Sequence, residues 1–125
     1  GKYTAGEVRK MLAGHGGLVA YTGSNDMRDL LKAAAEGDKE IAATVEAFHY
    51  QIGKEVGAMA AVMKGKVDQI ILTGGIAYGQ ETVDAITDMV GWIAPITVYP
   101  GEDELLALAQ GALRVLNGEE PARVY

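Results

Sequence analysis

The segment from Val67 to Ile76 constrains the fold of this chain more than any other. Its apolar and β-branched members are Val67, Ile70, Ile71 and Leu72, and they are followed by Gly74 and Gly75. Because the apolar positions are nearly continuous, the pattern predicts a strand that is buried on both faces. The two glycines lack Cβ atoms, so an anionic ligand can approach the backbone where the next helix is expected to begin. A plain tight turn is the alternative interpretation.

A second strand is expected after one intervening helix. The residues from Gln80 to Val90 have apolar positions on one helical face, and the segment from Ile96 to Tyr99 is typical of a strand. A strand, a helix and a strand in so short a span predict a right-handed parallel βαβ unit. The carboxyl ends of both strands then lie at one edge of the sheet, where open α/β sheets bind ligands. Trp92 and Ile93 are expected to pack beneath the second strand.

Helices are predicted before this unit. Thr4 and Glu7 form a capping box for a helix from Ala5 to Ala13. The segment from Leu18 to Tyr21 is interpreted as a short strand or an extended piece. Ser24 or Asn25 is then expected to cap a helix that runs through Leu31 to Ala35.

Two further helices are long. From Asp38 to Val62 the apolar residues recur every three or four positions, which predicts one continuous helix. Gly53, Gly57 and Ala61 form a row of small residues on it, which favours close packing of a neighbouring helix or sheet. The acids at 102–104 open a last helix that ends at Gly118.

Composition narrows the class of protein. A chain of 125 residues with 49% hydrophobic content is expected to be a single domain. A formal net charge of −6 favours neither a nucleic-acid partner nor an anionic membrane, since both are bound by clusters of Lys and Arg. There is no Cys, which excludes disulfides and thiolate metal sites, and no apolar run approaches the about 18 residues of a membrane span. We therefore expect a cytoplasmic protein.

Several segments together resemble the C-terminal part of the butyrate kinase family. These are GLVAY at 17–21, SNDMR at 24–28, ILTGGIA at 71–77, YPGEDELLALA at 99–109 and GALRVL at 111–116. That family is similar to acetate kinases and belongs to the actin-like ATPase superfamily. The resemblance implies an α/β fold, namely a helix-rich fragment of a ribonuclease-H-like domain with a small parallel βαβ sheet.

The resemblance also implies an activity. Such enzymes convert ATP and butyrate to ADP and butyryl phosphate with Mg²⁺, so this chain is expected to be the ATP/ADP-binding part of a short-chain acyl kinase. Family chains are longer, and the acyl-acceptor pocket and the catalytic groups are expected in the missing N-terminal domain. The isolated chain is therefore expected to be inactive, and a homo-oligomer is expected.

Site residues are implied by the same match. Asp26, Met27 and Arg28 would frame the adenine and ribose, although Asp26 at a helix start and an Asp26–Arg28 pair also have a purely structural interpretation. The second nucleotide loop would comprise Gly74, Gly75, Ile76, Ala77 and Tyr78. In this loop Gly75 would admit the phosphates and Tyr78 would cover the base.

Asp103 matches the position of an acid that is associated with Mg²⁺ in acetate kinases. Mg²⁺ prefers oxygen ligands and keeps several waters. The alternative is that these acids only stabilise the helix dipole. His15 and His49 have no Ser, Cys or second His at the spacing of a triad or a metal site, so neither is expected to be catalytic.

Two functions from other classes remain open. The first is a non-catalytic nucleotide-binding module with the same loops. The second is a dimerisation module that uses the row of small residues on the long helix, and the loop at Gly74 and Gly75 argues against it.

Overall fold

The computed structural model describes residues 2–123. Its elements in chain order are α1 (Ala5–Leu12), α2 (Leu18–Thr22), α3 (Met27–Ala35), α4 (Lys39–Val62), β1 (Ile70–Gly74), the 3₁₀ turn η1 (Gly75–Tyr78), α5 (Gln80–Val90), β2 (Ile96–Pro100) and α6 (Glu104–Leu116). The expected helix-rich α/β chain with a small parallel sheet is confirmed.

The sheet consists of β1 and β2, which pair in parallel from Ile70 opposite Ile96 to Gly74 opposite Pro100. The predicted βαβ unit is thus present, with α5 as the connection. At the end of the paired strands, the Gly74 N–H donates to the Gly101 carbonyl at 3.2 Å, and the Gly101 N–H donates to the Gly74 carbonyl at 3.1 Å. Both residues have positive φ, +85° at Gly74 and +103° at Gly101, which favours glycine there. The two carboxyl ends therefore lie together.

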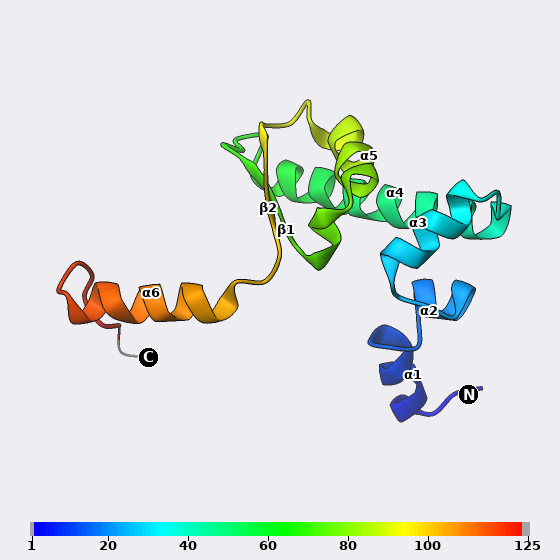
Figure 1. Ribbon diagram of the computed structural model, residues 1–125, viewed down its shortest axis with the longest axis horizontal. Coiled ribbons are helices and arrows are strands. Elements are labelled where there is room, and N and C mark those ends of the chain that lie inside the picture. Colours follow the sequence, from blue (N-terminus) through cyan, green and yellow to red (C-terminus); the bar gives the residue numbers. More distant parts are fainter. Residues whose placement is uncertain (1, 124–125) are drawn as a thin grey trace.

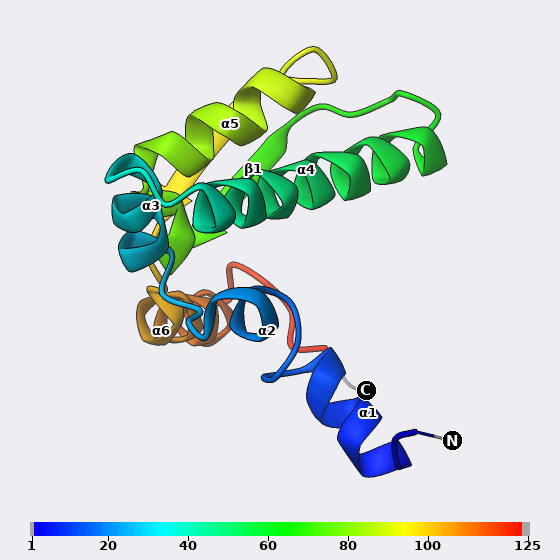
Figure 2. The same cartoon turned by 90° about the vertical axis from the view of Figure 1, so that its right-hand side faces the viewer.

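The helices α4 and α5 run side by side and cover one face of the sheet (Figure 2). The core between them contains Ile70 of β1, Ile86 and Val90 of α5, and Ala94. Ile71 points to the other face and is 59% exposed, so the expectation of a strand buried on both faces is wrong. The physical reason is that two strands with both packed helices on one side leave the second face uncovered.

In the row of small residues on α4, Gly53 allows the close packing of a neighbouring helix that the sequence predicts, and Gly57 does not take part in it. A Cβ atom at Gly53 would lie 2.7 Å from the sulfur of Met89 on α5, whereas one at Gly57 would meet no described atom within 4 Å. Trp92, expected beneath β2, is instead 81% exposed, and its indole N–H donates to the Met89 carbonyl. Ile93 is partly buried and packs against the core.

The segment from Leu18 to Tyr21 is helical, so its interpretation as a strand or extended piece is wrong. The Thr22 hydroxyl donates to the Leu18 carbonyl at 2.8 Å, and Leu18 packs against the core of α3 and α4. An apolar run this short carries no period that distinguishes the two states, so packing against α4 decides. The capping box of α1 is confirmed, but the cap of α3 is Asp26 and not Ser24 or Asn25.

The helix α6 extends away from the sheet at one end of the molecule, and α1 lies at the other end (Figure 1). Within the described residues 2–123, no residue of α6 is buried. The side chains of Leu105, Leu108 and Leu116 are each at least 70% exposed. No helix in this described part combines the length and the apolar character that crossing a bilayer requires.

Candidate functional site

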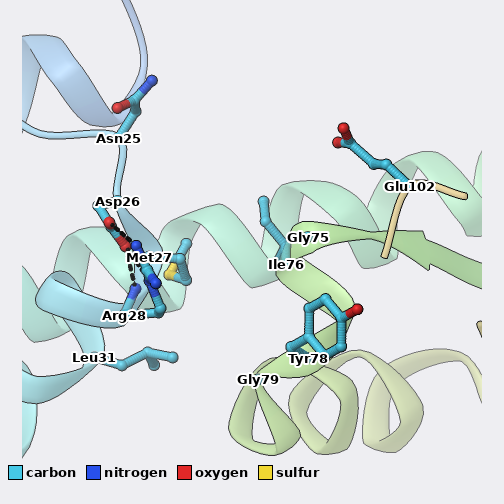
Figure 3. A pocket seen from close by; sticks show the side chains of 10 residues that line it. All are labelled: Asn25, Asp26, Met27, Arg28, Leu31, Gly75, Ile76, Tyr78, Gly79 and Glu102. Atoms are coloured by element: carbon cyan, nitrogen blue, oxygen red, sulfur yellow. Dashed lines mark hydrogen bonds and ion pairs between the residues drawn. The ribbon is translucent and has the colours of Figure 1, made fainter. Parts of the chain in front are cut away.

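A cleft of about 670 Å³ lies where α3, η1 and the end of β2 meet (Figure 3). Its volume is within the range of small-molecule sites. The residues that line it are Asn25, Asp26, Met27, Arg28, Leu31, Gly75, Ile76, Tyr78, Gly79 and Glu102. Segments that are far apart in the sequence therefore come together in one cavity, among them most of the residues expected to bind a nucleotide.

Asp26 and Arg28 form a closely paired wall of the cleft. One carboxylate oxygen of Asp26 accepts from the Arg28 backbone N–H and from Nε, both at 3.0 Å, and the other accepts from Nη2 at 2.6 Å. Hydrogen bonding to the guanidinium lowers the pKa of Asp26 to about 2. The same contact raises the pKa of Arg28. The Arg28 side chain is nevertheless 89% exposed, so the pair leaves its planar guanidinium accessible to a ligand.

The opposite wall is the turn η1. A Cβ atom at Gly75 would meet no described atom within 4 Å, so this backbone faces open space. Tyr78 is 72% exposed, and its hydroxyl lies against Gly101 at the end of β2. The next helix was expected to begin at Gly74 and Gly75, but the chain first forms η1 and is extended at Gly79 before α5 starts.

Two members of the expected loop lie elsewhere. Ala77 is 9% exposed and is not among the described residues that line the cleft. Gly74 lines a neighbouring cavity of about 580 Å³ together with Asp103, and Glu102 borders both cavities. The two cavities are thus adjacent.

Asp103 is the N-cap residue of α6, yet its side chain makes no capping hydrogen bond in the described chain. Residues 2–123 contain no group of three or more His, Cys, Asp or Glu side chains arranged to hold a metal ion. Mg²⁺ is commonly held by one or two carboxylates together with waters and substrate phosphates. The Asp103 carboxylate lines the cavity beside the cleft together with Glu102 and Glu104, and it fits that donor set.

Neither histidine lies in the cleft of the described chain. His15 is exposed in the loop after α1, and His49 is buried in α4, where its Nε2 lies 3.1 Å from the Thr82 hydroxyl oxygen. Burial lowers the pKa of His49. Sequence reasoning missed this partner, because nothing in the local pattern relates positions 33 residues apart.

Sequence reasoning also missed four residues that line the cleft, namely Asn25, Leu31, Gly79 and Glu102. Leu31 follows Met27 by four positions, so the helical period places both on one face of α3 and would have found it. Gly79 carried no such signal, because it reaches the cleft only through the extended break between η1 and α5.

Comparisons with known proteins relate this geometry to one family. The butyrate kinase 2 of Clostridium acetobutylicum and the probable butyrate kinase 2 of Caldanaerobacter subterraneus subsp. tengcongensis are each 55% identical to this chain over 125 residues. The match covers all of this chain and 35% of each relative, so the chain spans about a third of the length of these curated relatives.

Solved structures show the same fold. An acetate kinase from Porphyromonas gingivalis matches 92% of this chain and 35% of its own, with a TM-score of 0.77 and 21% identity. A propionate kinase from Francisella tularensis subsp. tularensis SCHU S4 matches 84% of this chain and 33% of its own, with a TM-score of 0.71 and 24% identity. The fold class expected from the sequence, part of an actin-like ATPase fold, is confirmed. The model of the Acetokinase family matches residues 2–114, and the chain belongs to this family.

Proposed function

We propose that this chain is the adenine-nucleotide-binding part of a short-chain acyl kinase, and that butyrate is the carboxylate which the complete enzyme phosphorylates. The observation that carries the proposal is the cleft that joins Asp26, Met27 and Arg28 to Gly75 and Tyr78. The 55% identity to butyrate kinases supports the choice of carboxylate.

The walls of the cleft suit the parts of a nucleotide. The guanidinium of Arg28 is held in place by Asp26 and is exposed, so it can stack on a purine base, and the aromatic ring of Tyr78 can cover the base from the other wall. The Asp26 carboxylate can accept a hydrogen bond from the ribose. At Gly75 the absence of a side chain lets phosphates approach the backbone.

Mg²⁺ would be held beside the cleft by Asp103, through water and the nucleotide phosphates. When bound, the ion would neutralise charge on the phosphates during phosphoryl transfer. The loop residues Gly74, Ile76 and Ala77 would shape the backbone between the nucleotide and the metal.

The acyl-acceptor pocket and the catalytic groups are proposed to lie in the part of the longer relatives that has no counterpart here. The exposed leucines of α6 support this, because a helix with so much apolar surface is expected to pack against further protein. We propose that the isolated chain binds ADP without transferring phosphate. Homo-oligomeric assembly and a cytoplasmic location complete the proposal.

Calorimetric titration of the chain with ADP and Mg²⁺ tests this function. The variant Gly75→Val should fold, since φ at Gly75 is not positive and its Cβ would point into open space, but the added side chain should occupy the cleft and abolish binding. Gly57→Val is the matched control, because a Cβ there also meets no described atom within 4 Å and lies outside the cleft.

Binding that Gly75→Val loses and Gly57→Val keeps is the expected result. A folded parent chain that shows neither heat nor a thermal shift at millimolar ADP would contradict the proposed binding function of the isolated chain. ADP binding that never supports kinase activity, even after the missing part of a relative is added, would favour a nucleotide-binding module without catalysis.

A further inference from the structure

A buried pair of polar side chains connects α4 and α5 behind the cleft. Nε2 of His49 lies 3.1 Å from Oγ1 of Thr82, and the two residues are 8% and 1% exposed. Thr82 is in the first turn of α5. Burial shields both side chains from water, so each depends on the other for a hydrogen bond.

The pair is connected to the cleft through the backbone. The N–H groups of Thr82 and Val83 both donate to the Gly79 carbonyl at 3.1 Å, and the Gly79 N–H donates to the Ile76 carbonyl at 3.0 Å. Gly79 and Ile76 line the cleft. Three hydrogen bonds, each joined to the next through the covalent structure of Thr82 or Gly79, therefore connect the buried ring of His49 to the wall of the proposed nucleotide site.

The chemistry of the pair suits a fixed structural contact. Burial lowers the pKa of His49 and so favours the neutral imidazole, which has one N–H donor and one acceptor nitrogen. A threonine hydroxyl can donate or accept, so the contact is satisfied in either tautomer. An apolar pair of similar size would fill the same space without fixing the direction of the first turn of α5.

We propose that the His49–Thr82 hydrogen bond positions the nucleotide loop, by fixing the first turn of α5 and, through Gly79, the backbone that lines the cleft. The inference rests on the proposed nucleotide site and extends it to two residues outside the cleft. His49 and Thr82 are positioning residues, since neither is among the described residues that contact the cleft.

The test compares ADP affinity, in the presence of Mg²⁺, among variants that keep or lose the hydroxyl. Thr82→Val preserves volume and removes the hydrogen bond, so ADP should bind about fivefold more weakly, the equivalent of one ordinary hydrogen bond. Thr82→Ser keeps the hydroxyl and should bind like the parent. Thr87→Val is the matched control, because the Thr87 hydroxyl donates only within α5, to the Val83 carbonyl.

The histidine is tested in the same way. His49→Gln retains a hydrogen-bonding group near the position of Nε2 and should preserve most of the affinity, whereas His49→Leu should weaken binding as Thr82→Val does. This second pair of variants decides the question if Thr82→Val does not fold.

Amide hydrogen exchange without nucleotide gives a readout that does not depend on the proposed function. In Thr82→Val the amides of Gly79, Thr82 and Val83 should exchange faster than in the parent, while the amides of β1 should exchange at the parent rate. In Thr82→Ser and Thr87→Val all of these amides should exchange at the parent rate. If the parent chain binds no ADP, the proposed function fails and this local acceleration alone decides the positioning role. Unchanged exchange, faster exchange throughout the chain, or parental ADP affinity in Thr82→Val would overturn the inference.

Discussion

Replacing Gly101 by alanine tests the backbone geometry that brings the two strand ends to the cleft. Gly101 has φ of +103° and pairs with Gly74 through both of its backbone groups. A residue with a Cβ atom is strained at such an angle, by about 1–2 kcal/mol. The new Cβ would also lie 2.6 Å from the Tyr78 hydroxyl. Because Tyr78 is 72% exposed, its ring can turn aside, so most of the loss of stability should come from the backbone.

We therefore expect Gly101→Ala to lower the free energy of unfolding by about 1–2 kcal/mol in urea denaturation. Adding Tyr78→Phe removes the nearest crowded atom, so it should recover only a small part of the loss. Gly57→Ala is the control with the opposite sign. It lies inside a helix with no described atom within 4 Å of a new Cβ, so it should gain roughly 0.5–1 kcal/mol.

A Gly101→Ala chain as stable as the parent would contradict this expectation. It would mean that the backbone at the end of β2 does not adopt a positive φ, and that the contact between Gly74 and Gly101 is not formed as described. Full recovery by Tyr78→Phe would show that side-chain crowding, and not backbone strain, determines the loss.

Three further predictions concern packing and protonation. Gly53→Ala should be less stable than Gly57→Ala by about 1–3 kcal/mol in urea denaturation, because its new Cβ crowds α5. Burial lowers the pKa of His49 below its ordinary value of 6.5, so the unfolded chain binds a proton at this histidine more readily than the folded chain. The free energy of unfolding should therefore fall as the pH drops below 6.5, and His49→Gln should remove this dependence. NMR titration should give Asp26 a pKa of about 2, and Arg28→Ala should raise this pKa toward 3.8. The small contribution of the Asp26–Arg28 pair to the free energy of unfolding should be lost as the pH falls through this range.

Elements with a local signal were predictable from the sequence. The capping box at Thr4 and Glu7 placed the start of α1, and the apolar period placed α5 at Gln80–Val90. Gly74 and Gly75 marked the end of β1, and Gly75 also marked the position of the cleft. In each case the residues that determine the structure are neighbours in the chain, so the pattern contains the information.

Elements that depend on packing were not predictable in this way. The helical state of the segment from Leu18 to Tyr21 depends on α4, and the exposure of Ile71 depends on which faces of the sheet are covered. The approach of Asp26 to Gly75 came from the family resemblance, since no local pattern relates the two positions. The partner of His49 came from the structure alone.

The most direct test of the proposed nucleotide site is a map of backbone amide shifts in NMR spectra of the chain during titration with ADP and Mg²⁺. We expect the amides of Met27, Arg28, Gly75, Ile76 and Gly79 to shift together, because these residues border one cleft. Shifts confined to the apolar groove of about 560 Å³ between α2 and α4, or no shifts at millimolar ADP, would contradict it.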